Sequence, residues 1–231
     1  MQPPPQPATF ELPLFPLQRV LFPGGHLPLR IFEVRYLDMI GRSHQAGTPF
    51  GVVCLTEGRE VRQPPPRNAP LAARGDGFAY EAFHDVGTTA TITHLEHPNP
   101  GLMEICCTGT QRFRIHARER LKHGLWMAQV ELLPDDSAVA VPSDLETVAT
   151  TLQDVVCNLV DRAASPAEMP LQPPYRWDDC GWVANRWCEL LPLGNADKQR
   201  FMSLDNPLLR LELVADVLDQ TGLAQSLAGR R

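Results

Sequence analysis

The chain has 231 residues, 43% of them hydrophobic, and a formal net charge of −6 with an isoelectric point near 5.6. That apolar content is enough for a substantial core in one or two domains. The acidic balance argues against a nucleic-acid partner, because proteins that bind a phosphate backbone usually carry dense basic stripes. Every apolar run falls short of the roughly 20 residues that cross a bilayer, and the first residues lack the basic and apolar regions of a secretion signal. We therefore expect a cytoplasmic protein with no membrane partner.

The proline-rich residues 1–9 predict a disordered arm. After them, an apolar stretch is interrupted by prolines, which are confined to strand edges, strand starts and bulges. We expect short extended pieces at 15–17 and 20–22, a tight turn at 23–25, and a strand over 27–31 with one buried face. The segment is thus predicted to form two strands of a curled sheet.

From Glu33 the apolar period changes to that of a short helix, which Gly41 and Gly47 are expected to end. A charged and aromatic string marks this strand-to-helix junction. Its side chains are close in sequence and mixed in sign, so we expect an ion-pair and stacking cluster that seats the helix. The string comprises Arg30, Phe32, Glu33, Arg35 and Tyr36.

Alternating segments continue as far as Pro134 and predict about seven strands at hairpin spacing. No long helix separates them, which is typical of a closed or nearly closed antiparallel barrel. The expected strands are 50–55, 78–83, 88–95, 102–108, 112–119 and 125–133, with a turn at 97–101 and a long mobile loop at 57–76.

The second half of the chain has a helical period. Ser143 or Asp144 is expected to cap a first helix, 178–191 to form a second, and Asn195 to cap a short third. The fourth should begin with Asn206 as its cap and Pro207 in its first turn, should bury Leu208, Leu211, Ala215 and Leu218, and should end at Gly222. The chain then divides into a barrel over 10–134, a helical bundle over 143–222 and a flexible tail over 223–231.

Several segments together resemble the N-terminal, substrate-binding domain family of Lon proteases, most closely the stand-alone bacterial members. They are "LPLFPLQRVLFPGGHLPLRIFEVRY", "FGVVCL", "GTTATI", "GTQRFRI" and the helical "ELLPLGNADKQRFMSLDNPLLRLELVADVL". The resemblance covers about residues 10–222. It implies an α+β fold, in which a PUA-like, mostly antiparallel β-barrel precedes a helical bundle. It also implies a non-catalytic module that recognises protein substrates.

Enzymatic signatures are missing from the sequence. The chain's two lysines, Lys122 and Lys198, follow no phosphate-binding glycine loop and lie in no recognisable Ser-Lys setting. There is also no nucleophile elbow, no metalloprotease helix and no dinucleotide fingerprint. We therefore expect a protein that is not an enzyme and that uses neither ATP nor a cofactor.

The best metal candidate is His94, Glu96 and His97, with His84 and Asp85 as possible additions. Because the segment ends a strand and enters a turn, we do not expect these side chains to converge on one metal ion. The preferred interpretation is that they are solvated turn residues. Cys180 and Cys188 lie about 12 Å apart on a helix, which is too far for a shared zinc. No metal site is predicted.

Two places merit a functional interpretation. Arg112 and Arg114 alternate with Phe113. The preferred interpretation is a core phenylalanine with solvated arginines, and the functional alternative is an arginine-bearing rim that contacts an acidic or carboxylate-terminated partner. Tyr175 and Trp177 follow a proline-rich segment between helices, where exposed aromatics would mark a peptide groove. The other aromatic candidates for apolar surface are Trp126, Trp182, Trp187 and Phe201.

Three functional hypotheses remain from the sequence. The first is a protein- or peptide-binding module for unfolded polypeptides or for one folded protein, such as a protease or chaperone. The second is RNA binding, since PUA-like barrels elsewhere bind RNA, although the isoelectric point counts against it. The third and weakest is a metal-dependent hydrolase built on His94, Glu96 and His97.

Overall fold

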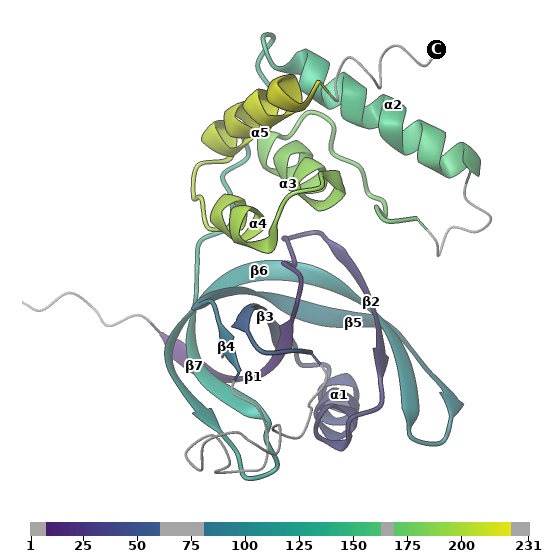
Figure 1. The fold of residues 1–231 in the computed structure, drawn as a ribbon, viewed down its shortest axis with the longest axis vertical. Helices are drawn as coiled ribbons and strands as arrows, with labels where there is room; N and C mark the ends of the chain where they lie inside the picture. Colours follow the sequence, from purple (N-terminus) through teal and green to yellow (C-terminus); the bar gives the residue numbers. More distant parts are fainter. Residues whose placement is uncertain (1–7, 61–80, 163–168, 223–231) are drawn as a thin grey trace, which may run out of the picture. The chain divides into compact units, whose positions relative to one another are not determined.

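The computed structural model describes residues 8–60, 81–162 and 169–222 (Figure 1). Most of the predicted arm, loop and tail therefore lies outside the described residues. The chain divides into two compact units. The first comprises residues 1–23 and 27–134, and the second comprises residues 24–26 and 135–231.

The first unit is a sheet that closes on itself. Its strands follow the order β1-β7-β6-β5-β3-β4, and an additional parallel pairing of β1 with β3 completes the ring, while β2 pairs with β6. The pairings of β1 with β7, β3 with β5, β5 with β6 and β6 with β7 are antiparallel. The predicted closed, mostly antiparallel barrel and the α+β class are confirmed. The strands are β1 (Thr9–Leu17), β2 (His26–Ile31), β3 (Phe50–Glu57), β4 (Ala82–Phe83), β5 (Val86–Asn99), β6 (Leu102–Arg120) and β7 (Trp126–Leu132).

The prolines of β1 occupy positions where the strand has one neighbour. Pro13 lies opposite Met127 in the half that pairs with β7, and Pro16 lies opposite Val53 in the half that pairs with β3. Because each half is bonded on one side, the missing N–H of proline need not interrupt a ladder. The extended piece expected at 20–22 does not form a strand; the chain there leads into a turn in which Gly24 has a φ of 73°.

Strands β5 and β6 form a longer hairpin than predicted. β5 continues to Asn99, beyond the expected start of the turn, and β6 runs through Gly109 without a break. The register shifts where Thr88 pairs with Arg112 and Ala90 with Gly109, so β6 has one extra residue there. Such a bulge disrupts the alternation of faces along a strand.

The helix of the first unit, α1 (Val34–Ala46), passes through Gly41 and ends at Gly47, whose φ of 65° is left-handed. Arg35, in the first turn of α1, is buried. Its guanidinium lies 3.0 Å from Glu33 and 3.4 Å from Glu81, donates to the Gly124 carbonyl at 2.8 Å, and lies 4.3 Å from the ring centre of Tyr36.

The expected cluster at the start of α1 is therefore present for Glu33, Arg35 and Tyr36. The prediction was wrong for two other members of the string: Arg30 pairs with Glu104 at the surface, and Phe32 is 55% exposed. Tyr36 also stacks on Phe15 at 4.0 Å between ring centres, which joins the cluster to the barrel core.

The second unit contains α2 (Glu146–Arg162), α3 (Cys180–Leu190), α4 (Asn195–Met202) and α5 (Pro207–Thr221). The predicted ends of α5 are confirmed: the Asn206 side chain accepts from the backbone N–H groups of Leu208 and Leu209, and Gly222 is the left-handed C-cap. The cap expected at Asn195 was wrong, because Gly194 is the N-cap of α4. The helix α2 begins slightly later than predicted.

The buried face of α5 differs from the predicted stripe. It comprises Pro207, Arg210, Leu211, Val214 and Leu218. The prediction was therefore wrong for Leu208 and Ala215, which are only half-buried, and a charged residue lies inside.

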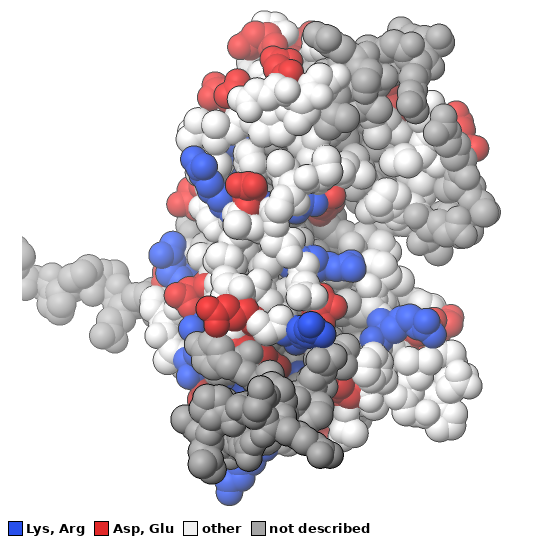
Figure 2. Space-filling view, viewed as in Figure 1, with Lys and Arg blue, Asp and Glu red and all other residues white. Residues whose placement is uncertain are grey.

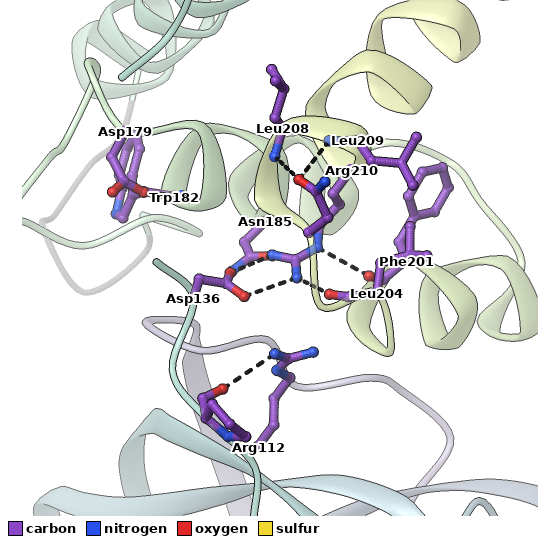
Figure 3. A network of polar contacts seen from close by, with 12 residues as sticks. Arg112, Asp136, Asp179, Trp182, Asn185, Phe201, Leu204, Leu208, Leu209 and Arg210 are labelled. Atoms are coloured by element: carbon purple, nitrogen blue, oxygen red, sulfur yellow. Dashed lines mark hydrogen bonds and ion pairs between the residues drawn. The ribbon is translucent and has the colours of Figure 1, made fainter. Parts of the chain in front are cut away.

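Arg210 is the hub of a polar network that joins three segments of the second unit (Figure 3). Its guanidinium contacts both carboxylate oxygens of Asp136, at 2.5 and 3.1 Å, and donates to Asn185 of α3 at 3.0 Å. It also donates to the carbonyls of Phe201, at 3.1 Å, and Leu204. The N–H groups of the Arg210 guanidinium therefore connect α5 to α3, to the end of α4 and to the chain at Asp136.

Among the residues that the structure describes, no helix is long and apolar enough to cross a membrane.

Candidate peptide-binding surface

Three aromatic rings meet where the chain enters α3. The centre of the Trp177 ring lies 5.0 Å from that of Tyr175 and 4.9 Å from that of Trp182, and Tyr175 and Trp182 are 6.0 Å apart. The two tryptophans cross at 87°. Such edge-to-face contacts are favourable geometries for aromatic side chains. We refer to Tyr175, Trp177 and Trp182 as the aromatic platform.

The platform is partly exposed. Trp182 is buried, whereas Tyr175 and Trp177 are half-buried, and the adjoining Pro173 and Pro174 are exposed. The rings of Tyr175 and Trp177 therefore present apolar area to solvent from a fixed base. This combination suits an apolar ligand, since rigid aromatic side chains lose little conformational entropy on binding.

The base of the platform is held by the backbone around Asp179. The Asp179 carboxylate caps α3 by accepting from the backbone N–H of Trp182 at 2.6 Å (Figure 3). The backbone N–H of Val141 donates to the Asp178 carbonyl and that of Cys180 to the Val139 carbonyl, both at 2.9 Å. These bonds fix the orientation of Trp182 before any ligand arrives.

The same segment is anchored at its other end by apolar burial. Met169 and Leu171 are both buried, and the side-chain amide of Gln172 donates to the Met169 carbonyl at 3.2 Å. Between these anchors and Asp179, the exposed Pro173 and Pro174 lead directly to Tyr175. The platform is thus formed by a short connection held at both ends.

The other aromatic candidates do not extend this surface. Trp187 is buried and its indole N–H donates to the Val148 carbonyl at 3.0 Å, and Phe201 is also buried. Trp126 belongs to the first unit, where its indole N–H donates to Glu81 at 2.8 Å. These rings are core or anchoring groups.

A buried ion pair lies on α3 beside Trp182. Arg186 is 1% exposed, its guanidinium carbon lies 5.9 Å from the Trp182 ring centre, and it contacts Glu189 at 2.8 Å. It also donates to the carbonyl of Gly24. Burial raises the pKa of the Glu189 carboxyl to about 7, against the opposing effects of Arg186 and then Lys198. Burial also lowers the pKa of Lys198, whose ammonium donates to the Glu189 carbonyl at 3.1 Å.

The two predicted arginines have opposite environments. Arg112 is 4% exposed and donates to the Pro134 carbonyl at 3.3 Å, so the expectation of a solvated side chain was wrong. Arg114 is exposed on β6. Arg112 pairs with Thr88 and Phe113 with Gly87 in unbroken register, so the two side chains point to opposite faces of β6, and both faces are covered at this point. The two arginines do not form a shared rim.

Charges of both signs are interspersed on the face drawn in Figure 2. On β6 and its neighbours, Arg118 pairs with Asp85 at 3.1 Å and His116 with Glu131 at 2.9 Å. The positive charge of Arg118 is thus already paired with a carboxylate, which weakens its attraction for a phosphate backbone.

The predicted metal candidates remain surface groups. His94 contacts Glu96 at 2.8 Å, and both side chains are exposed. Within the described parts of the chain, no three His, Cys, Asp or Glu residues converge as metal ligands would. Cys180 and Cys188 are both buried and free of a disulfide bond.

Sequence reasoning missed the buried charged residues. Arg210 and Arg186 are each 1% exposed. Arg210 occupies a position next to Leu211 in the helical period of the apolar face, and that position is the one signal that could have suggested its burial. Its partner Asp136 is 74 residues away, and no local pattern indicates it.

Comparisons with known proteins agree with this architecture. Residues 11–220 match the family model of the ATP-dependent protease La (LON) substrate-binding domain. The chain is 23% identical to the Lon protease of Parabacteroides distasonis over 193 residues, which are 83% of this chain and 21% of that protein. The chain thus spans about a fifth of the length of that curated relative.

Two solved structures share the fold. The Lon N-terminal domain protein from Xanthomonas campestris is 26% identical with a TM-score of 0.66, over 90% of this chain and 98% of that one. The N-terminal domain of the Mycobacterium avium complex Lon protease is 15% identical with a TM-score of 0.55, over 90% of this chain and 97% of that one. At this identity the similarity shows the fold alone.

Proposed function

Because the chain belongs to the family of Lon substrate-binding domains, we propose that it is a non-catalytic binding module that takes extended, apolar polypeptide segments on its aromatic platform. The observation that carries the proposal is the partial exposure of Tyr175 and Trp177, which pack on the buried Trp182. Unfolded polypeptides are the partner class that most often exposes apolar side chains.

The chemistry of the platform favours contact over catalysis. Ring faces and proline rings supply apolar area and shape, and the nearby ion pair of Arg186 with Glu189 is buried against the protein itself. Aromatic residues in rigid settings typically provide a large part of the binding free energy at protein interfaces. We infer a role in substrate recognition, with the chemistry of proteolysis supplied elsewhere.

The proposal is tested by fluorescence anisotropy with a labelled, permanently unfolded polypeptide, such as reduced and carboxymethylated lactalbumin. The titration is run at about 50 and about 300 mM salt, because screening separates ionic from apolar binding. We expect saturable binding whose affinity changes little between the two salt concentrations.

A structured RNA is titrated in the same buffers. RNA binding that weakens steeply with salt, together with no binding of the polypeptide, would favour the nucleic-acid hypothesis instead. Saturable binding of neither ligand would also contradict the proposal.

A further inference from the structure

A hollow lies between α4 and α5, and none of the residues that line it belongs to the aromatic platform. Its volume is about 320 Å³, which is at the small end of the range for ligand sites. The apolar part of the lining consists of Leu193, Phe201, Leu204, Leu213 and Val217. A space of this size accepts one large apolar side chain.

The hollow is preformed by the Arg210 network. The carbonyls of Phe201 and Leu204, two lining residues, accept hydrogen bonds from the Arg210 guanidinium, which is itself buried. Ser203 lies between these two residues at the end of α4, and its hydroxyl donates to the Gln199 carbonyl at 2.8 Å. A site that needs no rearrangement loses less free energy on binding.

The rim of the hollow is acidic on balance. Asp197 and Asp216 are exposed lining residues on α4 and α5, against one exposed arginine, Arg200. The helix α5 also exposes Glu212 and Asp219, and its one basic residue, Arg210, is buried. Acidic side chains are visible where α5 lies in Figure 2.

We propose that this hollow binds a polypeptide segment in which a large apolar side chain, Leu or Phe, is followed by Lys or Arg. The apolar group enters between Phe201 and Val217, and the cation lies between the carboxylates of Asp197 and Asp216. The proposal adds a second, charge-selective site to the proposed function and shares its premise that the chain binds polypeptides.

The test is an NMR titration of isotope-labelled full chain with the capped hexapeptide Gly-Phe-Arg-Gly-Ser-Gly, up to about 1 mM, which reaches weak affinities. We expect saturable shifts of the amide signals from α4 and α5. The indole N–H signals of Trp177 and Trp182 should stay in place, which separates this site from the platform.

Two control peptides define the specificity. Replacing Arg by Glu in the peptide should abolish the shifts, because the anion meets the carboxylates of the rim, and replacing Phe by Ala should abolish them because the hollow stays unfilled. Equal binding of either control, or no saturable shift with the original peptide, would overturn the proposal.

Variants of the rim are expected to change affinity without affecting the fold. The double variant Asp197→Asn, Asp216→Asn should weaken binding about threefold to tenfold, in line with exposed ion pairs. Arg200→Gln should strengthen binding about twofold, since it removes a repulsive charge. The matched control Glu212→Gln, an exposed acid of α5 outside the lining, should leave the affinity unchanged.

The two proposals fail independently. The variant Val217→Phe fills the hollow and should abolish the hexapeptide shifts while unfolded polypeptide still binds the platform. Tyr175→Ala should leave the hexapeptide affinity unchanged. Loss of hexapeptide binding in Tyr175→Ala, or unchanged binding in Val217→Phe, would contradict a separate site between α4 and α5.

Discussion

The carboxylate of Asp136 contacts two nitrogens of the Arg210 guanidinium, at 2.5 and 3.1 Å, across 74 residues of chain. Asp136 follows the end of the first unit along the chain, and Arg210 lies in the first turn of α5. Because Arg210 also holds the carbonyls of Phe201 and Leu204, this ion pair organises the ends of several elements at once.

Replacing Arg210 by Met should strongly destabilise the second unit. The variant leaves Asp136 and the carbonyls of Phe201 and Leu204 without their donor, and breaking a buried pair typically costs about 3–5 kcal/mol in the free energy of unfolding. Urea unfolding followed by circular dichroism measures the change. The matched control is Arg200→Met, an exposed arginine, which should shift the free energy of unfolding by less than about 0.5 kcal/mol.

Two glycines of the first unit should respond oppositely to alanine. At Gly87 an added Cβ would lie 2.5 Å from the Val52 carbonyl oxygen and 2.6 Å from Phe113, so Gly87→Ala should destabilise the barrel by about 1–3 kcal/mol. At Gly41, inside α1, nothing lies within 4 Å of the new atom, and Gly41→Ala should stabilise by about 0.5–1 kcal/mol. Thermal unfolding of both variants tests this contrast; equal melting temperatures would contradict it.

The cap of α5 should contribute measurably to stability. Asn206→Ala removes the acceptor for the backbone N–H groups of Leu208 and Leu209 and should lower the free energy of unfolding by about 1 kcal/mol. Asn206→Asp keeps an acceptor and should remain close to the parent protein. Chemical denaturation of the three proteins provides the comparison, and an equal loss in both variants would count against the capping role.

Glu189 should give the protein a specific dependence on pH. Burial raises the pKa of its carboxyl to about 7 from the ordinary value of 4.5, so the folded protein keeps a proton that the unfolded chain has already released. The contribution of this group to the free energy of unfolding therefore falls as the pH rises through that window, by at most about 3 kcal/mol.

The variant Glu189→Gln isolates this effect, because the other titrating groups are common to both proteins. Between about pH 5 and about pH 8, the parent protein should lose stability relative to the variant. Urea unfolding at several pH values measures the difference. A difference that is constant with pH would show that Glu189 does not titrate in this range.

The extent to which the sequence predicts this molecule depends on how local each signal is. Asn206, Pro207 and Gly222 define α5 through bonds to near neighbours, and the prediction of its ends was correct. Arg112 was placed wrongly because its burial depends on contact with the chain at Pro134, which is 22 residues away. Pairing between segments far apart in sequence leaves no trace in local alternation.

In the candidate site, too, the local features were predicted and those that depend on distant segments were not. Tyr175 and Trp177 were singled out because they adjoin a proline-rich connection, and the structure brings them together with Trp182 within eight positions of chain. The hollow between α4 and α5 was not predicted, because its shape depends on Arg210 and on a partner 74 residues away.

The most direct test of the account is the affinity for a permanently unfolded polypeptide when the platform is truncated. We predict that the double variant Tyr175→Ala, Trp177→Ala weakens binding about tenfold or more, as expected for aromatic hot spots. The control Phe32→Ala, which removes an aromatic side chain that is 55% exposed in the first unit, should leave the affinity unchanged. A folded double variant that binds as tightly as the parent protein would contradict the assignment of the platform as the recognition surface.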